Sequence, residues 1–102
     1  MRKGKLCSQA AHASLGVTLK NLDHPDVKAW LAGRFTKITV YVNSEEELNE
    51  IYQKAVDACI IVDEIIDAGF TEFNNVPTKT CIAIGPALNE RIDKIAGHLP
   101  LF

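Results

Sequence analysis

Two stretches of this sequence carry side chains that could do chemistry together, and the first opens the chain. Lys3 and Lys5 lead into a run rich in alanine that also holds Gln9. Lys5 and Gln9 are four residues apart, so on a helix they lie on one face, one turn apart. Because a lysine in the first turn opposes the helix dipole, these lysines indicate an anionic partner near this end of the helix.

The second stretch is the loop that begins at Asp67 and contains Gly69 and Thr71. Asp67 closes an apolar run typical of a strand, and Gly69 allows a turn that brings Asp67 close to Thr71. A carboxylate and a hydroxyl so placed could orient a water molecule and stabilise a developing oxyanion. The alternative, which the residues alone favour, is that Asp67 only bonds the backbone of its loop.

Other catalytic signals in the sequence are weaker. His12 and His98 are interpreted as structural histidines, and no group of His, Cys and Asp has the spacing of a metal site. No glycine-rich phosphate loop or dinucleotide fingerprint is present, so a nucleotide cofactor has no support. The cysteines, which form no Cys-x-x-Cys pair, are predicted to be reduced thiols of a cytosolic protein. They are Cys7, Cys59 and Cys81.

Length and composition indicate one globular domain over residues 1–102, and no apolar run reaches the roughly 18–20 residues that a membrane span needs. The net charge of −2 hides an asymmetry. Residues 1–40 hold seven Lys or Arg and two Asp, a net +5, whereas residues 41–102 hold four Lys or Arg and eleven Asp or Glu, a net −7. Such a split is typical of a protein with a basic face toward a phosphate-bearing partner.

Hydrophobic periodicity predicts the elements that position these side chains. Ser44 and Glu47 form a capping box that starts a core-facing helix of roughly fourteen residues. A short helix from Pro25 is expected to be held to the core by Trp30 and Leu31. The strand–helix–strand order around the capping box indicates a parallel, right-handed unit. The remaining patterns predict helices over residues 4–20 and 88–96 and strands over residues 37–42, 60–66 and 78–84.

Several segments, in order along the whole chain, resemble the type 2 peptidyl-tRNA hydrolases. The opening residues Met1-Arg2-Lys3-Gly4-Lys5, with Gln9 and His12, resemble the family's first motif. Asp67-Ala68-Gly69-x-Thr71 resembles its Asp-Ala-Gly-Arg-Thr-Gln loop. Thr78-x-Thr80-x-x-x-Ile84-Gly85-Pro86 resembles the family's final strand. Ile92-Asp93-Lys94-Ile95-x-Gly97-His98-Leu99 resembles its C-terminal helix.

The resemblance implies an enzyme that hydrolyses the ester between a peptide and the 3′ ribose of tRNA, without a metal or an organic cofactor. It implies an α/β fold, a three-layer α/β/α domain with a small mixed sheet and about four helices. A cytoplasmic protein, and a homodimer as its assembly, are further expectations. Matching positions imply catalytic roles for Lys5, Asp67, Thr71 and Thr80, and substrate-binding roles for Lys3, Gln9 and Phe70.

Three departures from the family pattern qualify this interpretation. Phe70 stands where many members have Arg, and Glu72 stands where they have Gln, although Phe70 could stack on the terminal adenine. These changes leave open the alternative of a non-catalytic member that binds RNA or a protein partner. The family also has an apolar first strand before the opening motif. Three of its four strands are therefore expected here, with Met1 interpreted as an internal methionine and a partner chain as the alternative source of the strand.

Overall fold

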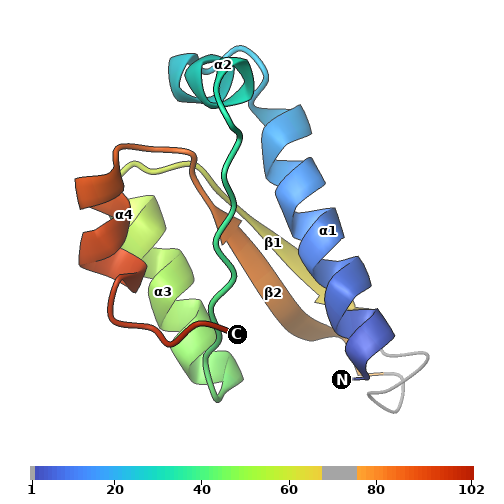
Figure 1. Ribbon diagram of the computed structural model, residues 1–102. Coiled ribbons are helices and arrows are strands. Elements are labelled where there is room, and N and C mark those ends of the chain that lie inside the picture. The colour runs from blue at the N-terminus through green and yellow to red at the C-terminus, as the bar shows by residue number, and fades with distance from the viewer. Residues whose placement is uncertain (1, 68–75) are drawn as a thin grey trace.

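A computed structural model describes residues 2–67 and 76–102 of the chain (Figure 1). The described residues form an α/β fold, which confirms the predicted fold class, and the predicted number of helices also agrees. The elements, in chain order, are α1 (Lys3–Lys20), α2 (Pro25–Ala32), α3 (Glu45–Asp57), β1 (Val62–Asp67), β2 (Thr78–Ile84) and α4 (Asn89–Ala96).

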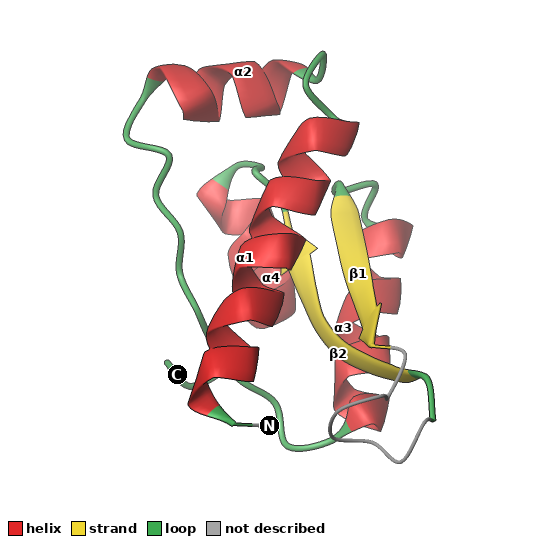
Figure 2. Cartoon of the chain, turned by 90° about the vertical axis from the view of Figure 1, so that its right-hand side faces the viewer, coloured by secondary structure: helices red, strands yellow, loops and turns green. Residues whose placement is uncertain are grey.

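The elements are arranged in three layers. Helix α1 covers one face of the β1–β2 sheet, and α3 and α4 lie on the opposite side (Figures 1 and 2). On that second side, α3 and α4 bury an apolar core against the sheet, whose buried members are Ile51, Ala55, Ile60 and Ile95. None of the described helices is long and apolar enough to cross a membrane.

The sheet in the described part of the chain has two antiparallel strands rather than the expected mixed set. The pairing runs from Val62 opposite Ile84 to Asp67 opposite Thr78. It is interrupted by a bulge, because Ile65 pairs with Cys81 whereas the next residue, Ile66, pairs with Lys79. Thr80 therefore has no cross-strand partner, which makes it the extra residue of the bulge.

The predicted strand over residues 37–42, and with it the parallel unit, is wrong. This segment makes an isolated bridge between Val40 and Leu101, supported by bonds from Tyr41 N to Pro100 O and from Phe102 N to Thr39 O. Alternating β-branched residues favour an extended backbone, but a strand forms only where that backbone finds a ladder of partners. Here the C-terminal tail provides one bridge, so the segment is extended without joining the described sheet.

Helix α3 begins as the sequence predicts. Ser44 Oγ accepts a hydrogen bond from Glu47 N at 3.1 Å, and Glu47 Oε1 accepts one from Asn43 N at 3.4 Å. The acidic side chains of the first turn also favour the positive end of the helix dipole. This start fixes the register in which Ile51 and Ala55 turn toward the core.

Helix α2 is held differently from the prediction. Val27 is completely buried, whereas Trp30 is partly exposed and Leu31 is 43% exposed. The indole of Trp30 donates to Thr36 O at 2.9 Å and so binds the chain that follows the helix. The expectation that Trp30 and Leu31 hold α2 to the core is therefore wrong, and the smaller Val27 does so.

Helix α1 lies close to the sheet because its inward face is made of short side chains. Ala13 and Val17 are buried there, and Gly16 faces Asp63 of β1 so closely that a Cβ atom would lie 2.6 Å from the carboxylate. The same carboxylate forms an ion pair with Lys20 at 2.9 Å. These contacts fix the C-terminal half of α1 along β1 and leave its N-terminal half over the end of that strand (Figure 2).

Candidate active site

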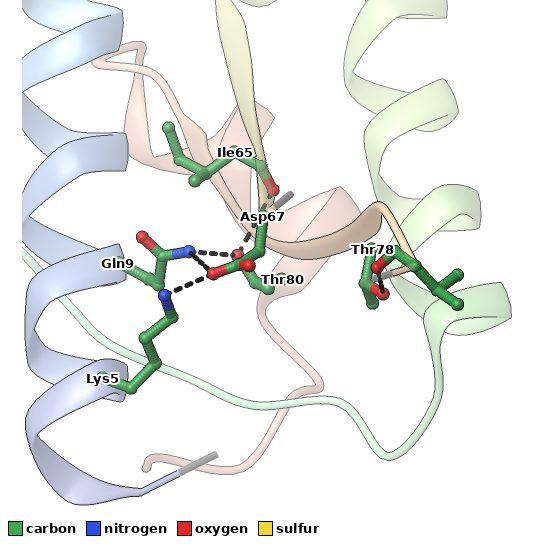
Figure 3. A network of polar contacts seen from close by, with 7 residues as sticks. Lys5, Gln9, Ile65, Asp67, Thr78 and Thr80 are labelled. Atoms are coloured by element: carbon green, nitrogen blue, oxygen red, sulfur yellow. Dashed lines mark hydrogen bonds and ion pairs between the residues drawn. The ribbon is translucent and has the colours of Figure 1, made fainter. Parts of the chain in front are cut away.

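Four polar side chains meet where the first turns of α1 pass over the end of β1 and the start of β2 (Figure 3). Gln9 Nε2 donates to Asp67 Oδ2 at 3.3 Å and to Thr80 Oγ1 at 3.2 Å. Lys5 Nζ forms an ion pair with the same Asp67 oxygen. We call Lys5, Gln9, Asp67 and Thr80 the polar cluster.

The members of the polar cluster differ in how far they are withdrawn from water. The side chain of Asp67 is 7% exposed and Gln9 is 5% exposed, whereas the side chain of Lys5 is 27% exposed. A buried carboxylate requires both a counter-ion and hydrogen-bond donors, and Lys5 and Gln9 supply them. The arrangement thus presents a partly exposed cation over a buried carboxylate, which suits polarisation of a carbonyl group beside a bound water molecule.

The bulge in β2 directs two consecutive side chains toward Gln9. Thr80 Oγ1 accepts from the Gln9 amide and donates to Ile65 O at 3.3 Å. The Cys81 thiol donates to the backbone oxygen of Gln9, with Sγ 3.1 Å from that atom. In a regular strand, neighbouring side chains point to opposite faces, so the bulge is what lets both residues contact α1.

Burial raises the pKa of the Cys81 thiol above its ordinary value of 9.0, and a hydrogen bond with Thr80 acts in the opposite direction. The contact between the Cys81 thiol and the backbone of Gln9 was not predicted from the sequence. Strict alternation along β2 places Cys81 away from Thr80, and the sequence carries no signal for the bulge. The three cysteines are free thiols, as predicted.

The structure brings together four of the seven side chains that the sequence proposed for the site. They are Lys5, Gln9, Asp67 and Thr80, and the expected alignment of Lys5 with Gln9 is confirmed because both contact Asp67 Oδ2. Lys3 is exposed in the first turn of α1, outside the polar cluster. Phe70 and Thr71 lie outside the described residues.

The place of the site was predicted for a reason that the structure corrects. The sequence argument assumed that the loop after Asp67 leaves the carboxyl end of a parallel strand. Asp67 does end β1, but β2 begins opposite it in an antiparallel pair, so the site combines a strand end with a strand start. Thr78, at that start, donates to Val76 O at 2.9 Å and stays apart from the polar cluster (Figure 3).

The chain is similar to known proteins over its whole length. The family model described as "Peptidyl-tRNA hydrolase PTH2" matches residues 1–102. A peptidyl-tRNA hydrolase of Nanoarchaeum equitans is 44% identical, over 98% of this chain and 88% of the relative. Another, from Methanocaldococcus jannaschii, is 43% identical, over 99% of this chain and 89% of the relative. A match over the whole length, with relatives at this identity, shows that the chain belongs to the peptidyl-tRNA hydrolase PTH2 family.

Proposed function

We propose that the polar cluster is the active centre at which this protein hydrolyses the ester bond between peptide and tRNA in peptidyl-tRNA, releasing free tRNA. The activity follows from membership of the family. The observation that carries the assignment of the site is the convergence of Lys5 and Gln9, one helical turn apart, on a single oxygen of the buried Asp67 carboxylate.

Ester hydrolysis needs a water molecule to attack the acyl carbon while negative charge develops on the carbonyl oxygen. In the proposed mechanism the Asp67 carboxylate takes a proton from that water. The Lys5 ammonium, which is the more exposed member of the ion pair, stabilises the oxyanion. The bond between the acyl carbon and the ribose O3′ then breaks. Water supplies the hydroxyl group of the peptide acid and the hydrogen of the ribose hydroxyl, so the atoms balance.

Gln9 and Thr80 hold the carboxylate in place for this step. The two hydrogen bonds from Gln9 Nε2 fix Asp67 relative to Thr80, and the Thr80 hydroxyl is itself fixed on the backbone of β1. Contact of Gln9 with the substrate stays a prediction, and it would use Oε1 because Nε2 donates within the polar cluster. Thr71 is proposed to complete the same hydrogen-bond network from its loop.

Binding of the tRNA 3′ end is proposed to involve Lys3 and Phe70. The first turn of α1 contains no acidic residue. Lys3 and the positive end of the helix dipole therefore favour a phosphate group there. Phe70 is proposed to stack on the terminal adenine, since every base offers a face to an aromatic ring.

The proposal also includes a cytoplasmic location and a homodimer. Three free thiols suit a reducing compartment. For the dimer, Leu15 and Leu19 lie one turn apart on α1 and are both exposed, which gives a second copy an apolar surface to cover. Light scattering over a range of protein concentrations would measure the mass, and a monomer mass at all of them would contradict the dimer.

The test of the active centre is a peptidyl-tRNA hydrolysis assay with three single variants. Asp67→Ala removes the buried carboxylate and Lys5→Ala removes its counter-ion, and each is expected to lower kcat by about 10²–10³-fold. Lys20→Ala is the matched control, because it also removes an ion-paired cation from α1 but lies at the other end of the helix. It is expected to keep the wild-type rate.

Two results of this assay would contradict the proposal, and a third would favour the alternative function. Full activity in Lys5→Ala, or an equal loss in Lys20→Ala, would contradict the assignment of the site. Salt-dependent binding of tRNA by the wild-type protein without turnover would instead favour a non-catalytic member that binds RNA.

A further inference from the structure

Cys81 lies in β2, and its side chain contacts helix α1, which carries Lys5 and Gln9 of the proposed active centre. Its thiol donates to the backbone oxygen of Gln9, 72 positions away in the sequence, with Sγ 3.1 Å from that oxygen. Gln9 lies within helix α1, where its carbonyl already belongs to the helical hydrogen-bond pattern. The thiol is therefore an added contact that joins β2 to the backbone of Gln9 itself.

This contact acts on the same residue as the bond from the neighbouring threonine. Strand β2 makes two hydrogen bonds with Gln9. Thr80 accepts one from its side-chain nitrogen, and Cys81 donates one to its backbone oxygen. Two contacts on one residue fix both the position of its backbone and the direction of its side chain. The bulge makes this possible, since it brings consecutive residues of β2 to the helix side of the sheet.

We infer that Cys81 is a positioning residue for the hydrolysis reaction, which holds Gln9 so that its amide reaches Asp67 and Thr80 together. The inference rests on the proposed function of the polar cluster. The thiol donates its hydrogen bond to the backbone oxygen of Gln9, so it acts on the carboxylate through Gln9. A neutral donor suits this place, and burial raises the pKa of the thiol, which further favours its protonated form.

The first part of the test compares variants of Cys81 in the peptidyl-tRNA assay. Cys81→Ala removes the donor, and kcat is expected to fall about 3- to 10-fold with KM unchanged, the scale of one hydrogen bond. Cys81→Ser keeps a donor at nearly the same place and is expected to recover most of that loss. Ile82→Val is the matched control, because Ile82 lies next in β2 but packs against the core on the opposite side of the sheet.

The second part is a double-mutant cycle with Gln9. If Cys81 acts through Gln9, Cys81→Ala lowers kcat in the wild-type background and has no further effect in Gln9→Ala. The Tm of every variant is measured beside its rate, so that lost stability is separated from lost catalysis. A Cys81→Ala protein that does not fold is replaced in the cycle by Cys81→Val, which fills the site without a donor and whose loss of kcat must then also disappear in Gln9→Ala.

The outcomes separate this inference from the proposed function. The positioning role alone is overturned if Cys81→Ala lowers kcat equally in the wild-type and Gln9→Ala backgrounds. It is also overturned if Ile82→Val and Cys81→Ala lower kcat equally while they lower Tm by the same amount. Full activity in Gln9→Ala overturns the proposed role of the polar cluster, and the positioning role with it. Loss confined to the wild-type background, with recovery by Cys81→Ser, supports the inference.

Discussion

Gln9 and Asp67 are joined by one hydrogen bond of 3.3 Å, and the same Gln9 nitrogen reaches Thr80 at 3.2 Å. A single amide on α1 thus ties the last residue of β1 to the bulge of β2. Both hydrogens of that amide are used within the polar cluster, so a shift of the helix changes both contacts together. The geometry of the carboxylate depends on the packing of α1 on the sheet, and the substitutions below test this dependence.

Thr80→Val is expected to lower kcat by about 10²-fold, the scale of a misplaced catalytic group. The substitution keeps the shape of the side chain but leaves Gln9 Nε2 with one acceptor fewer and Ile65 O without its donor. Thr80→Ser, which keeps the hydroxyl, is the control and should retain most of the rate. Equal rates for the two variants would show that the hydroxyl has no part in the reaction.

Lys3 and Lys5 are expected to affect different kinetic constants. Lys5 is paired with the buried carboxylate, so Lys5→Ala should lower kcat. Lys3 is exposed, and Lys3→Ala should raise KM with kcat little changed. A phosphate contact of Lys3 also predicts that the slope of log(kcat/KM) against log salt becomes shallower by about 0.7 in this variant. An unchanged slope would argue against a phosphate contact at Lys3.

The sequence predicts local structure well wherever the cause is local. The capping residues Ser44 and Glu47 and the strand that starts at Thr78 need only their own neighbours to be recognised. Val40 illustrates the opposite case, since its β-branched surroundings favour an extended chain but its pairing depends on Leu101, 61 positions away. A local sequence pattern does not indicate which segment will pair with the extended chain. A strand was therefore predicted over residues 37–42, whereas only an isolated bridge forms.

The candidate site divides along the same line. Lys5 and Gln9 could be aligned from helical spacing alone, and Asp67 could be singled out because it ends an apolar run. The joint contact of Thr80 and Cys81 with α1 could not be predicted, because neighbouring side chains of a regular strand point to opposite faces and only the bulge at Thr80 brings both to one face. Residue types and spacings therefore identify the charged and polar groups, whereas the fine placement of their supports comes from strand register.

Val27→Ala is expected to destabilise the protein by about 2 kcal/mol, or roughly 10 °C in Tm, because it removes two methyl groups from a completely buried site. Leu31→Ala, in the same helix but at an exposed position, is the control and should change stability by no more than about 0.5 kcal/mol. Thermal unfolding followed by circular dichroism measures both. Helix α2 lies at the end of α1 away from the polar cluster (Figure 1), so the hydrolysis rate of folded Val27→Ala should match that of wild type.

Alkaline solution is expected to weaken the folded state through Cys81. Burial favours the neutral thiol, so the folded-state pKa lies above 9.0 and the unfolded chain loses this proton first as the pH rises. The contribution of Cys81 to stability is therefore complete below pH 9 and is lost as the pH rises from 9 through the folded-state pKa. Urea unfolding at pH 8 and pH 10 should show a larger drop in the free energy of unfolding for wild type than for Cys81→Ala. Because lysines and tyrosines also titrate there, the difference between the two proteins is the quantity to measure, and equal drops would mean that the thiol ionises as readily in the folded protein as in the unfolded chain.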